Sequence, residues 1–181
     1  MKLELSLQNQ QRIRAIKVRR LREIVRSLLA EQLQFTEVEL NIVLVSARRM
    51  AQVNEQFLRH EGSTDVITFD YLESRHIRRS AGPQPSRLCG ELLVCVEEAV
   101  TQAEVFQTSW PAEVVRYIVH GVLHLCGEDD QTPAARRIMK RRENRLVRRL
   151  EQKFSFAALA RKPAARQAAG ASAGGCWARK R

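Results

Sequence analysis

The segment SWPAEVVRYIVHGVLHLCGEDD, residues 109–130, combines a helical pattern with two histidines and a run of acidic residues. Its apolar residues recur with helical spacing, Pro111 suits a first helical turn, and Gly127 suits a C-terminal cap. We therefore expect one helix that ends near Gly127. His120 and His124 stand four residues apart near its end, so their side chains point the same way, one turn apart.

Two imidazoles on one helix face can bind one metal ion, and zinc suits such a pair. The spacing alone is weak evidence, because a buried histidine can simply form hydrogen bonds. Gly121 strengthens it, because glycine inside a helix costs about 1 kcal/mol relative to alanine and indicates close approach of another segment or a substrate. After Gly127, the acidic residues Glu128, Asp129 and Asp130 can return a carboxylate to the same ion. Two imidazoles and one carboxylate leave a fourth position open for water, as in catalytic zinc sites.

The residue that follows His120 argues against one familiar chemistry. Protease helices of the H-E-x-x-H type place a general-base glutamate directly after the first histidine. Here that position is Gly121, which cannot accept a proton. Peptide hydrolysis by that mechanism is therefore disfavoured.

The flanking sequence predicts an α/β (α+β) fold in which a small mixed sheet packs with helices. Leu3, Leu5 and Leu7 alternate with polar residues, which is the period of a half-buried strand. Further strands are expected at residues 38–46, 64–71 and 90–96, and helices at 18–33, from Ser46 past Phe57, at 97–106 and at 132–150. Between the last two strands, residues 72–89 show no periodicity and are expected to form a long exposed loop.

The charge of the chain points to a polyanionic partner. Lys and Arg number 31 against 20 Asp and Glu, which gives a formal net charge of +11. Such a surface attracts nucleic acid first of all, although arginine-rich helices are also often only solvated faces. The last expected helix is the densest positive feature, with a thin apolar stripe at Met139, Leu146 and Leu150.

The cysteines and the apolar segments bear on compartment. The four cysteines form no CxxC pair, which fits reduced thiols and argues against a cysteine-based metal site. No run approaches the roughly 18 apolar residues of a membrane span, and the first residues lack the apolar core of a signal peptide. We expect a cytoplasmic protein with no membrane contact.

The composition also predicts where the fold ends. The segment ALARKPAARQAAGASAGGCWARKR, residues 158–181, is rich in alanine and glycine and has no acidic residue. We expect a single domain over residues 1–153 and a basic, disordered tail over 154–181.

Three ordered blocks of the sequence resemble one family. HGVLHLCGEDD resembles the H-G-x-x-H-L-x-G-x-x-H signature of the YbeY family of metal-dependent endoribonucleases. VNEQFLRHEGSTDVITFDY (residues 53–71) and GELLV (residues 90–94) are similar to that family's two other signature blocks. The resemblance extends from the first strand to about Leu150.

This resemblance implies a zincin-like fold and a zinc-dependent endoribonuclease, with another divalent metal as the alternative ion. It implies a single-strand-specific enzyme of 16S and small-subunit rRNA maturation and of ribosome quality control. The partners would be ribosomal RNA, its precursors and the small ribosomal subunit.

Carried over by position, the family's metal ligands fall on His120, His124 and Asp130. The third position departs from the family, which usually has histidine there. Aspartate is still a competent zinc ligand, and it lowers the net charge of the site by one. Glu128, Asp129 or His60 are the alternative third ligands.

Three other positions in the second block bear on the site. Leu58 stands where many members of the family carry an arginine that is thought to contact RNA, and Arg59 is its neighbour. Thr64 and Asp65 match the family's cleft-lining pair. Their alternative role is to cap a turn at the start of a strand.

Two other functions compete with the nuclease. One is a non-catalytic, RNA-binding ribosome-assembly factor whose metal only holds the fold, in which case four protein ligands should close the site. The other is a hydrolase of a small phosphoester, which would not need so large a positive charge.

Overall fold

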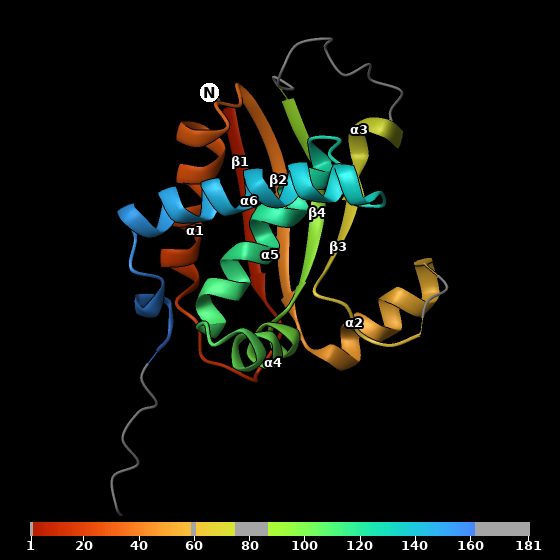
Figure 1. Cartoon of the computed structure of the whole chain (residues 1–181), viewed down its shortest axis with the longest axis vertical. Helices are drawn as coiled ribbons and strands as arrows, with labels where there is room; N and C mark the ends of the chain where they lie inside the picture. The colour runs from red at the N-terminus through yellow and green to blue at the C-terminus, as the bar shows by residue number, and fades with distance from the viewer. Residues whose placement is uncertain (1, 59–60, 75–86, 162–181) are drawn as a thin grey trace, which may run out of the picture.

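The computed structural model describes residues 2–58, 61–74 and 87–161 (Figure 1). One sheet has the strand order β1-β2-β4-β3. Its strands are β1 (Lys2–Asn9), β2 (Glu37–Val45), β3 (Val66–Asp70) and β4 (Arg87–Cys95). β1, β2 and β4 run parallel, and β3 pairs antiparallel with β4 at the edge. The sheet is therefore small and mixed, as the sequence predicts.

The helices begin where the sequence provides caps. They are α1 (Val18–Ser27), α2 (Ala47–Val53), α3 (Tyr71–Ser74), α4 (Val96–Phe106), α5 (Trp110–Leu125) and α6 (Pro133–Lys153). The side chains of Ser46, Ser109 and Thr132 each accept a hydrogen bond from the backbone amide three residues later. Wider π-helical turns at Leu28–Gln32 and Asn54–Leu58 continue α1 and α2, so the expected helical spans are helical but not uniformly α-helical.

The two faces of the sheet pack against different helices. On β2, Leu40 and Ile42 face the larger core, which α1, α5 and α6 complete. Val43 and Val45 face the other side, where Met50 of α2 covers them. Figure 1 shows α6 lying across α5, which itself lies across the sheet. The layers are therefore α2, sheet, α5 and α6, and α5 is held on both sides.

Gly121 allows α5 to approach the sheet closely. A Cβ atom added there would lie 2.8 Å from Cδ2 of Leu92 and 3.1 Å from Cγ2 of Val66. The close approach expected from this mid-helix glycine is therefore made by side chains of β4 and β3, and not by a substrate. It fixes the depth at which the neighbouring His120 sits.

The sequence predicts a loop over residues 72–89, but regular structure occupies both ends of that span. The span begins within α3, where Leu72 is buried and its amide donates to Oδ1 of Asp70 at 2.9 Å. The last residues of the span belong to β4, which starts at Arg87. Residues 75–86 lie outside the described residues.

The fold continues beyond Lys153, where the sequence predicts a disordered tail. Phe156 and Leu159 are buried in a 3-10 turn (Phe156–Leu159). The amide of Lys17 donates to the carbonyl of Leu159 at 2.8 Å, and that of Arg161 to Ala15 at 2.9 Å. The expected boundary after 153 therefore falls too early, because two apolar side chains three residues apart dock on the core. The rest of the expected tail, residues 162–181, lies outside the described residues.

This docking predicts different effects for two truncations. Ending the chain after Lys153 removes the buried Phe156 and Leu159 and should lower the free energy of unfolding by about 3 kcal/mol. Ending it after Arg161 should leave the unfolding midpoint nearly unchanged, because the removed segment has no periodic apolar face. Urea denaturation of both truncations measures the difference, and equal midpoints would contradict the docking.

Among the described helices, none combines the length and the apolar character needed to cross a membrane.

Candidate metal centre

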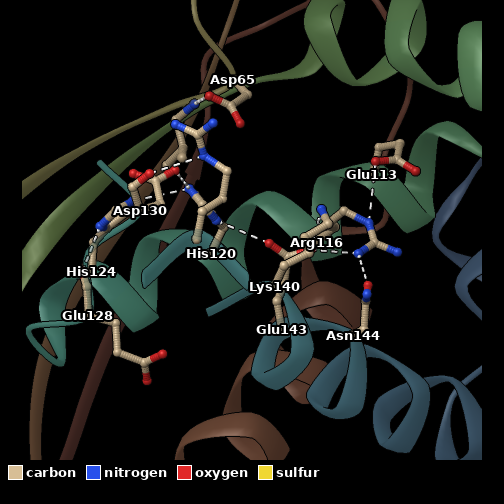
Figure 2. A network of polar contacts seen from close by, with 12 residues as sticks. Asp65, Glu113, Arg116, His120, His124, Glu128, Asp130, Lys140, Glu143 and Asn144 are labelled. Carbon is tan, nitrogen blue, oxygen red and sulfur yellow. Dashed lines mark hydrogen bonds and ion pairs between the residues drawn. The ribbon is translucent and has the colours of Figure 1, made fainter. Parts of the chain in front are cut away.

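The C-terminal end of α5 and the turn after it bring three potential ligands together (Figure 2). Nε2 of His120 lies 3.1 Å from Nε2 of His124 and 3.9 Å from Oδ2 of Asp130. All three donor atoms lie within 4.8 Å of one another, and the three side chains are partly exposed. The cluster is thus compact enough for one ion and is open to solvent.

The turn after α5 sends the chain back over the helix end. Gly127 has φ +85°, a left-handed conformation that glycine adopts without strain. Its amide donates to the carbonyl of His124 at 2.8 Å, and the amide of Glu128 donates to Leu123 at 3.0 Å. Nε of Arg136 then donates to the carbonyl of Asp130 at 3.1 Å. These bonds place Asp130 beside the imidazoles.

The outer nitrogens of both imidazoles are held by acceptors. Nδ1 of His124 lies 3.0 Å from the carbonyl oxygen of Glu128, and Nδ1 of His120 lies 3.1 Å from Oε2 of Glu143. In the neutral rings Nδ1 therefore carries the hydrogen, and the two Nε2 lone pairs face each other. Two such lone pairs at 3.1 Å repel unless a metal ion lies between them or one ring is protonated and donates to the other. Two nitrogen ligands of a tetrahedral zinc ion are ~3.3 Å apart, so the pair fits such an ion.

Glu143 is the buried anion behind the cluster. Its side chain is 2% exposed and accepts hydrogen bonds from Arg116 at 2.6 Å and Lys140 at 2.9 Å, besides the one from His120. Burial would raise the pKa of Glu143, but the hydrogen bonds from His120, Lys140 and Arg116 lower it to about 2. Arg116 is held in turn by Oδ1 of Asn144 at 2.7 Å. Glu143 is therefore a fixed negative charge at neutral pH.

The surroundings of His120 favour a positive charge at the cluster. Burial lowers the pKa of His120, but the hydrogen bond and charge of Glu143, with the charges of Asp65 and Asp130, raise it above its ordinary value. The same carboxylates that stabilise a proton there also stabilise a metal cation.

The other expected third ligands are engaged elsewhere or lie outside the described residues. The carboxylate of Glu128 pairs with Arg142, and Oδ1 of Asp129 accepts the amide of Gln131 at 3.1 Å. His60 lies outside the described residues. Of the acidic residues in the turn, only Asp130 belongs to the cluster of donors found in the described part of the chain.

Two neighbouring cavities lie near the cluster. One of about 370 Å³ is lined by His120, Asp130 and Arg136 among others. A second, of about 620 Å³, lies beside it. Four residues line both cavities, namely Asp65, Arg116, Tyr117 and Lys140. The metal cluster therefore opens onto the smaller cavity, and the larger one lies directly beside that cavity.

Thr64 and Asp65 show both roles that the sequence suggests for them. Oδ1 of Asp65 accepts from Oγ1 of Thr64 and from the amide of Val66, each at 2.9 Å, and so caps the start of β3. Both residues also line the larger cavity. The side chain of Leu58 and all of Arg59 lie outside what the structure describes.

Two residues of the site were not predicted. Glu143 falls between Met139 and Leu146 on the apolar stripe of α6, so a carboxylate in that stripe was the available signal. Arg116 precedes His120 by four residues and shares its helix face, which was a second signal.

Comparison with known proteins gives consistent results. A family profile described as Endoribonuclease YbeY matches residues 6–151. A protein with that description from Bacteroides fragilis is 38% identical over 109 residues, which cover 60% of this chain and 70% of the relative. Another, from Chlorobium phaeovibrioides, is 31% identical over 135 residues, or 75% of this chain and 83% of the relative. A solution structure of a Thermotoga maritima protein shares the fold, with a TM-score of 0.56, 21% identity and coverage of 82% of this chain and 90% of that one.

Proposed function

Because this chain belongs to the YbeY family of endoribonucleases, we propose that it cleaves RNA with a divalent ion held by His120, His124 and Asp130. Zinc is the ion that two imidazoles and one carboxylate suit best. The observation that carries the proposal is the pair of facing Nε2 atoms at 3.1 Å, each fixed by an acceptor on the opposite ring nitrogen. Family membership supports a hydrolase of the nuclease class, as the sequence resemblance implies.

The residues around the cluster would each perform one task. When bound, the ion supplies Lewis acidity toward a phosphoryl oxygen and activates water for attack. Glu143 and the carbonyl of Glu128 orient the two imidazoles, as outer-shell partners of zinc ligands do. Lys140 and Arg136, which line the smaller cavity, stand where they neutralise charge that develops on the phosphate.

We further propose that the substrate is single-stranded RNA from precursors of 16S rRNA, cleaved in the cytoplasm during maturation and quality control of the small ribosomal subunit. The net charge of +11 supports a large polyanionic substrate over a small phosphoester. α6 supports it too, because its exposed basic residues extend from the metal cluster along the helix.

The competing assembly-factor function predicts a closed metal site. A structural zinc ion has four protein ligands, whereas the cluster found among the described residues offers three. The open position favours catalysis. Chelation distinguishes the two functions, because cleavage of single-stranded RNA should stop with EDTA and return with added zinc, while an assembly factor would cleave in neither state.

Reversing three exposed arginines of α6 should weaken RNA binding. We expect the triple variant Arg141→Glu, Arg145→Glu, Arg148→Glu to bind unrelated RNA sequences at least about tenfold more weakly, because phosphate contacts are lost. The slope of log affinity against log salt should also shrink, by about 0.7 for each phosphate contact. Fluorescence anisotropy across a salt series measures both quantities.

The matched control replaces Arg19, Arg20 and Arg26 by glutamate, which reverses three exposed charges on α1. Both variants change the net charge equally. If the two triple variants lose the same affinity, net charge alone explains binding and α6 is only a solvated face.

A further inference from the structure

The larger cavity beside the metal cluster has no role in the proposed cleavage so far. It is formed by Glu98, Gln102 and Phe106 of α4, Tyr117 of α5 and Asn144 of α6, among others. Its volume of about 620 Å³ lies within the range of about 300–1,000 Å³ that is typical of small-molecule sites. It shares four wall residues with the smaller cavity, so it lies next to any ligand that is bound at the metal cluster.

The charges of this cavity are unevenly distributed. The cations Arg116 and Lys140 line both cavities and so mark their junction. Glu98 and Glu113 line only the larger one. The junction carries both signs of charge, because Asp65 also lines both cavities and Glu143 pairs with Arg116 and Lys140, whereas the residues that line only the larger cavity include no cation. A phosphate is therefore disfavoured in the interior, and the cations nearest to it stand at the junction. The interior suits an uncharged group that offers hydrogen-bond donors.

Two aromatic residues of the wall have no partner for their characteristic interaction among the residues that the structure describes. Phe106 leaves 66% of its surface exposed, although it lines the cavity. Tyr117 is 5% exposed, and its hydroxyl is buried without a hydrogen-bond partner in the described structure. Such an unsatisfied hydroxyl costs about 1–3 kcal/mol. Burial raises the pKa of Tyr117, and the charges of Asp65, Glu113 and Glu98 raise it further, so the hydroxyl keeps its proton and lies near the acidic wall.

We propose that the larger cavity is a nucleoside subsite, which takes the base and ribose of one unpaired RNA nucleotide while its phosphate lies at the junction beside the metal cluster. The base stacks on Phe106, and the hydroxyl of Tyr117 hydrogen-bonds to the bound nucleoside. A base inside a duplex cannot enter, because it would first have to leave the stack. The inference rests on the proposed nuclease function and assigns its selection of single strands to this cavity.

The test compares Phe106→Ala with Val105→Ala in the full-length protein. Val105 directly precedes Phe106 and is about as exposed, at 65%, but it does not line the cavity. Stacking of one base contributes about 1–3 kcal/mol, so Phe106→Ala should weaken binding of a single-stranded RNA oligonucleotide about tenfold. Val105→Ala should stay within about twofold of the wild type, and neither change should alter binding of a blunt RNA duplex. If Phe106→Ala binds the single strand as Val105→Ala does, the subsite is wrong.

A second variant separates ligand binding from stability. Tyr117→Phe removes a hydroxyl that has no partner within the described part of the chain, so its unfolding midpoint should equal or exceed that of the wild type. Its affinity for the single-stranded oligonucleotide should nevertheless fall severalfold. Wild-type affinity in this variant would overturn the role of the hydroxyl.

These binding measurements do not depend on cleavage, so the two proposals can fail separately. A zinc-loaded wild type that cleaves RNA, with no dependence of binding on Phe106, rejects the subsite alone. A wild type whose binding depends on Phe106 but that never cleaves RNA rejects the nuclease and retains the nucleoside site.

Discussion

Replacing Asp130 by alanine should reduce zinc affinity and the rate of RNA cleavage together, each by on the order of a hundredfold. The carboxylate lies 3.9 Å from Nε2 of His120, and its removal leaves only the two imidazoles of the cluster as donors. Loss of an outer-shell partner alone costs about 10–100-fold in metal affinity or activity, so loss of a ligand should cost at least as much. Metal content after dialysis and cleavage of a single-stranded RNA are the two measurements.

Two variants, one at Asp130 itself and one at its neighbour, serve as controls for Asp130→Ala. Asp130→His should retain zinc and activity, because it restores the ligand that the family usually has and supplies one donor atom at similar reach. Asp129→Ala should also retain both, since Asp129 accepts the amide of Gln131 instead. If Asp130→Ala keeps full zinc occupancy and activity while Asp129→Ala or His60→Ala loses them, the third ligand lies elsewhere.

The second large effect is expected at Glu143. Glu143→Ala should lower the free energy of unfolding by about 3 kcal/mol, because Arg116 loses its nearest carboxylate and keeps only Glu113 at 3.6 Å and the amide oxygen of Asn144. Glu143→Gln keeps the shape but removes the charge that fixes His120, so zinc affinity should fall by about 10–100-fold. Denaturation and competition with a zinc-binding dye measure these quantities.

Glu151→Gln is the control, because Glu151 is an exposed carboxylate on the same helix. It should change neither quantity. Wild-type zinc affinity in Glu143→Gln would show that Glu143 only completes the fold and does not orient a metal ligand.

The geometry of the histidine pair could be predicted from the sequence because it follows from helix dimensions alone. Four residues of α-helix turn about 400°, so His120 and His124 had to share a face once α5 was recognised. The position of Asp130 is a different case, since it depends on the left-handed φ of Gly127 and on the bond from Arg136. Glycine signalled the turn, but only the structure brings the carboxylate to the imidazoles.

The second layer of the site could not be predicted because it depends on how two helices cross. Glu143 reaches His120 only because α6 lies across α5 (Figure 1), and nothing in either helix sequence sets that angle. The place of Glu143 in the apolar stripe indicates that it faces the protein, but no pattern in the sequence pairs it with His120.

The end of the fold, predicted at residue 153, lies further along the chain for a related reason. Phe156 and Leu159 are two apolar residues in a segment dominated by alanine and basic residues, so average composition hides them. Their burial depends on a tertiary contact, the docking of the turn beside Ile16, which no local pattern reveals. The π-helical turns after α1 and α2 are likewise set by packing, because helical periodicity alone does not separate them from α-helix.

The central claim is that one ion held by His120, His124 and Asp130 is required for RNA cleavage. The most direct measurement is a zinc titration of the metal-free protein, in which bound metal and the cleavage rate of a single-stranded RNA are followed in the same samples. Cleavage should rise from background and reach its plateau at one zinc ion per chain in the wild type, and His120→Ala should show no such rise. Full cleavage by the metal-free wild type, or equal activity in His120→Ala, would contradict the account.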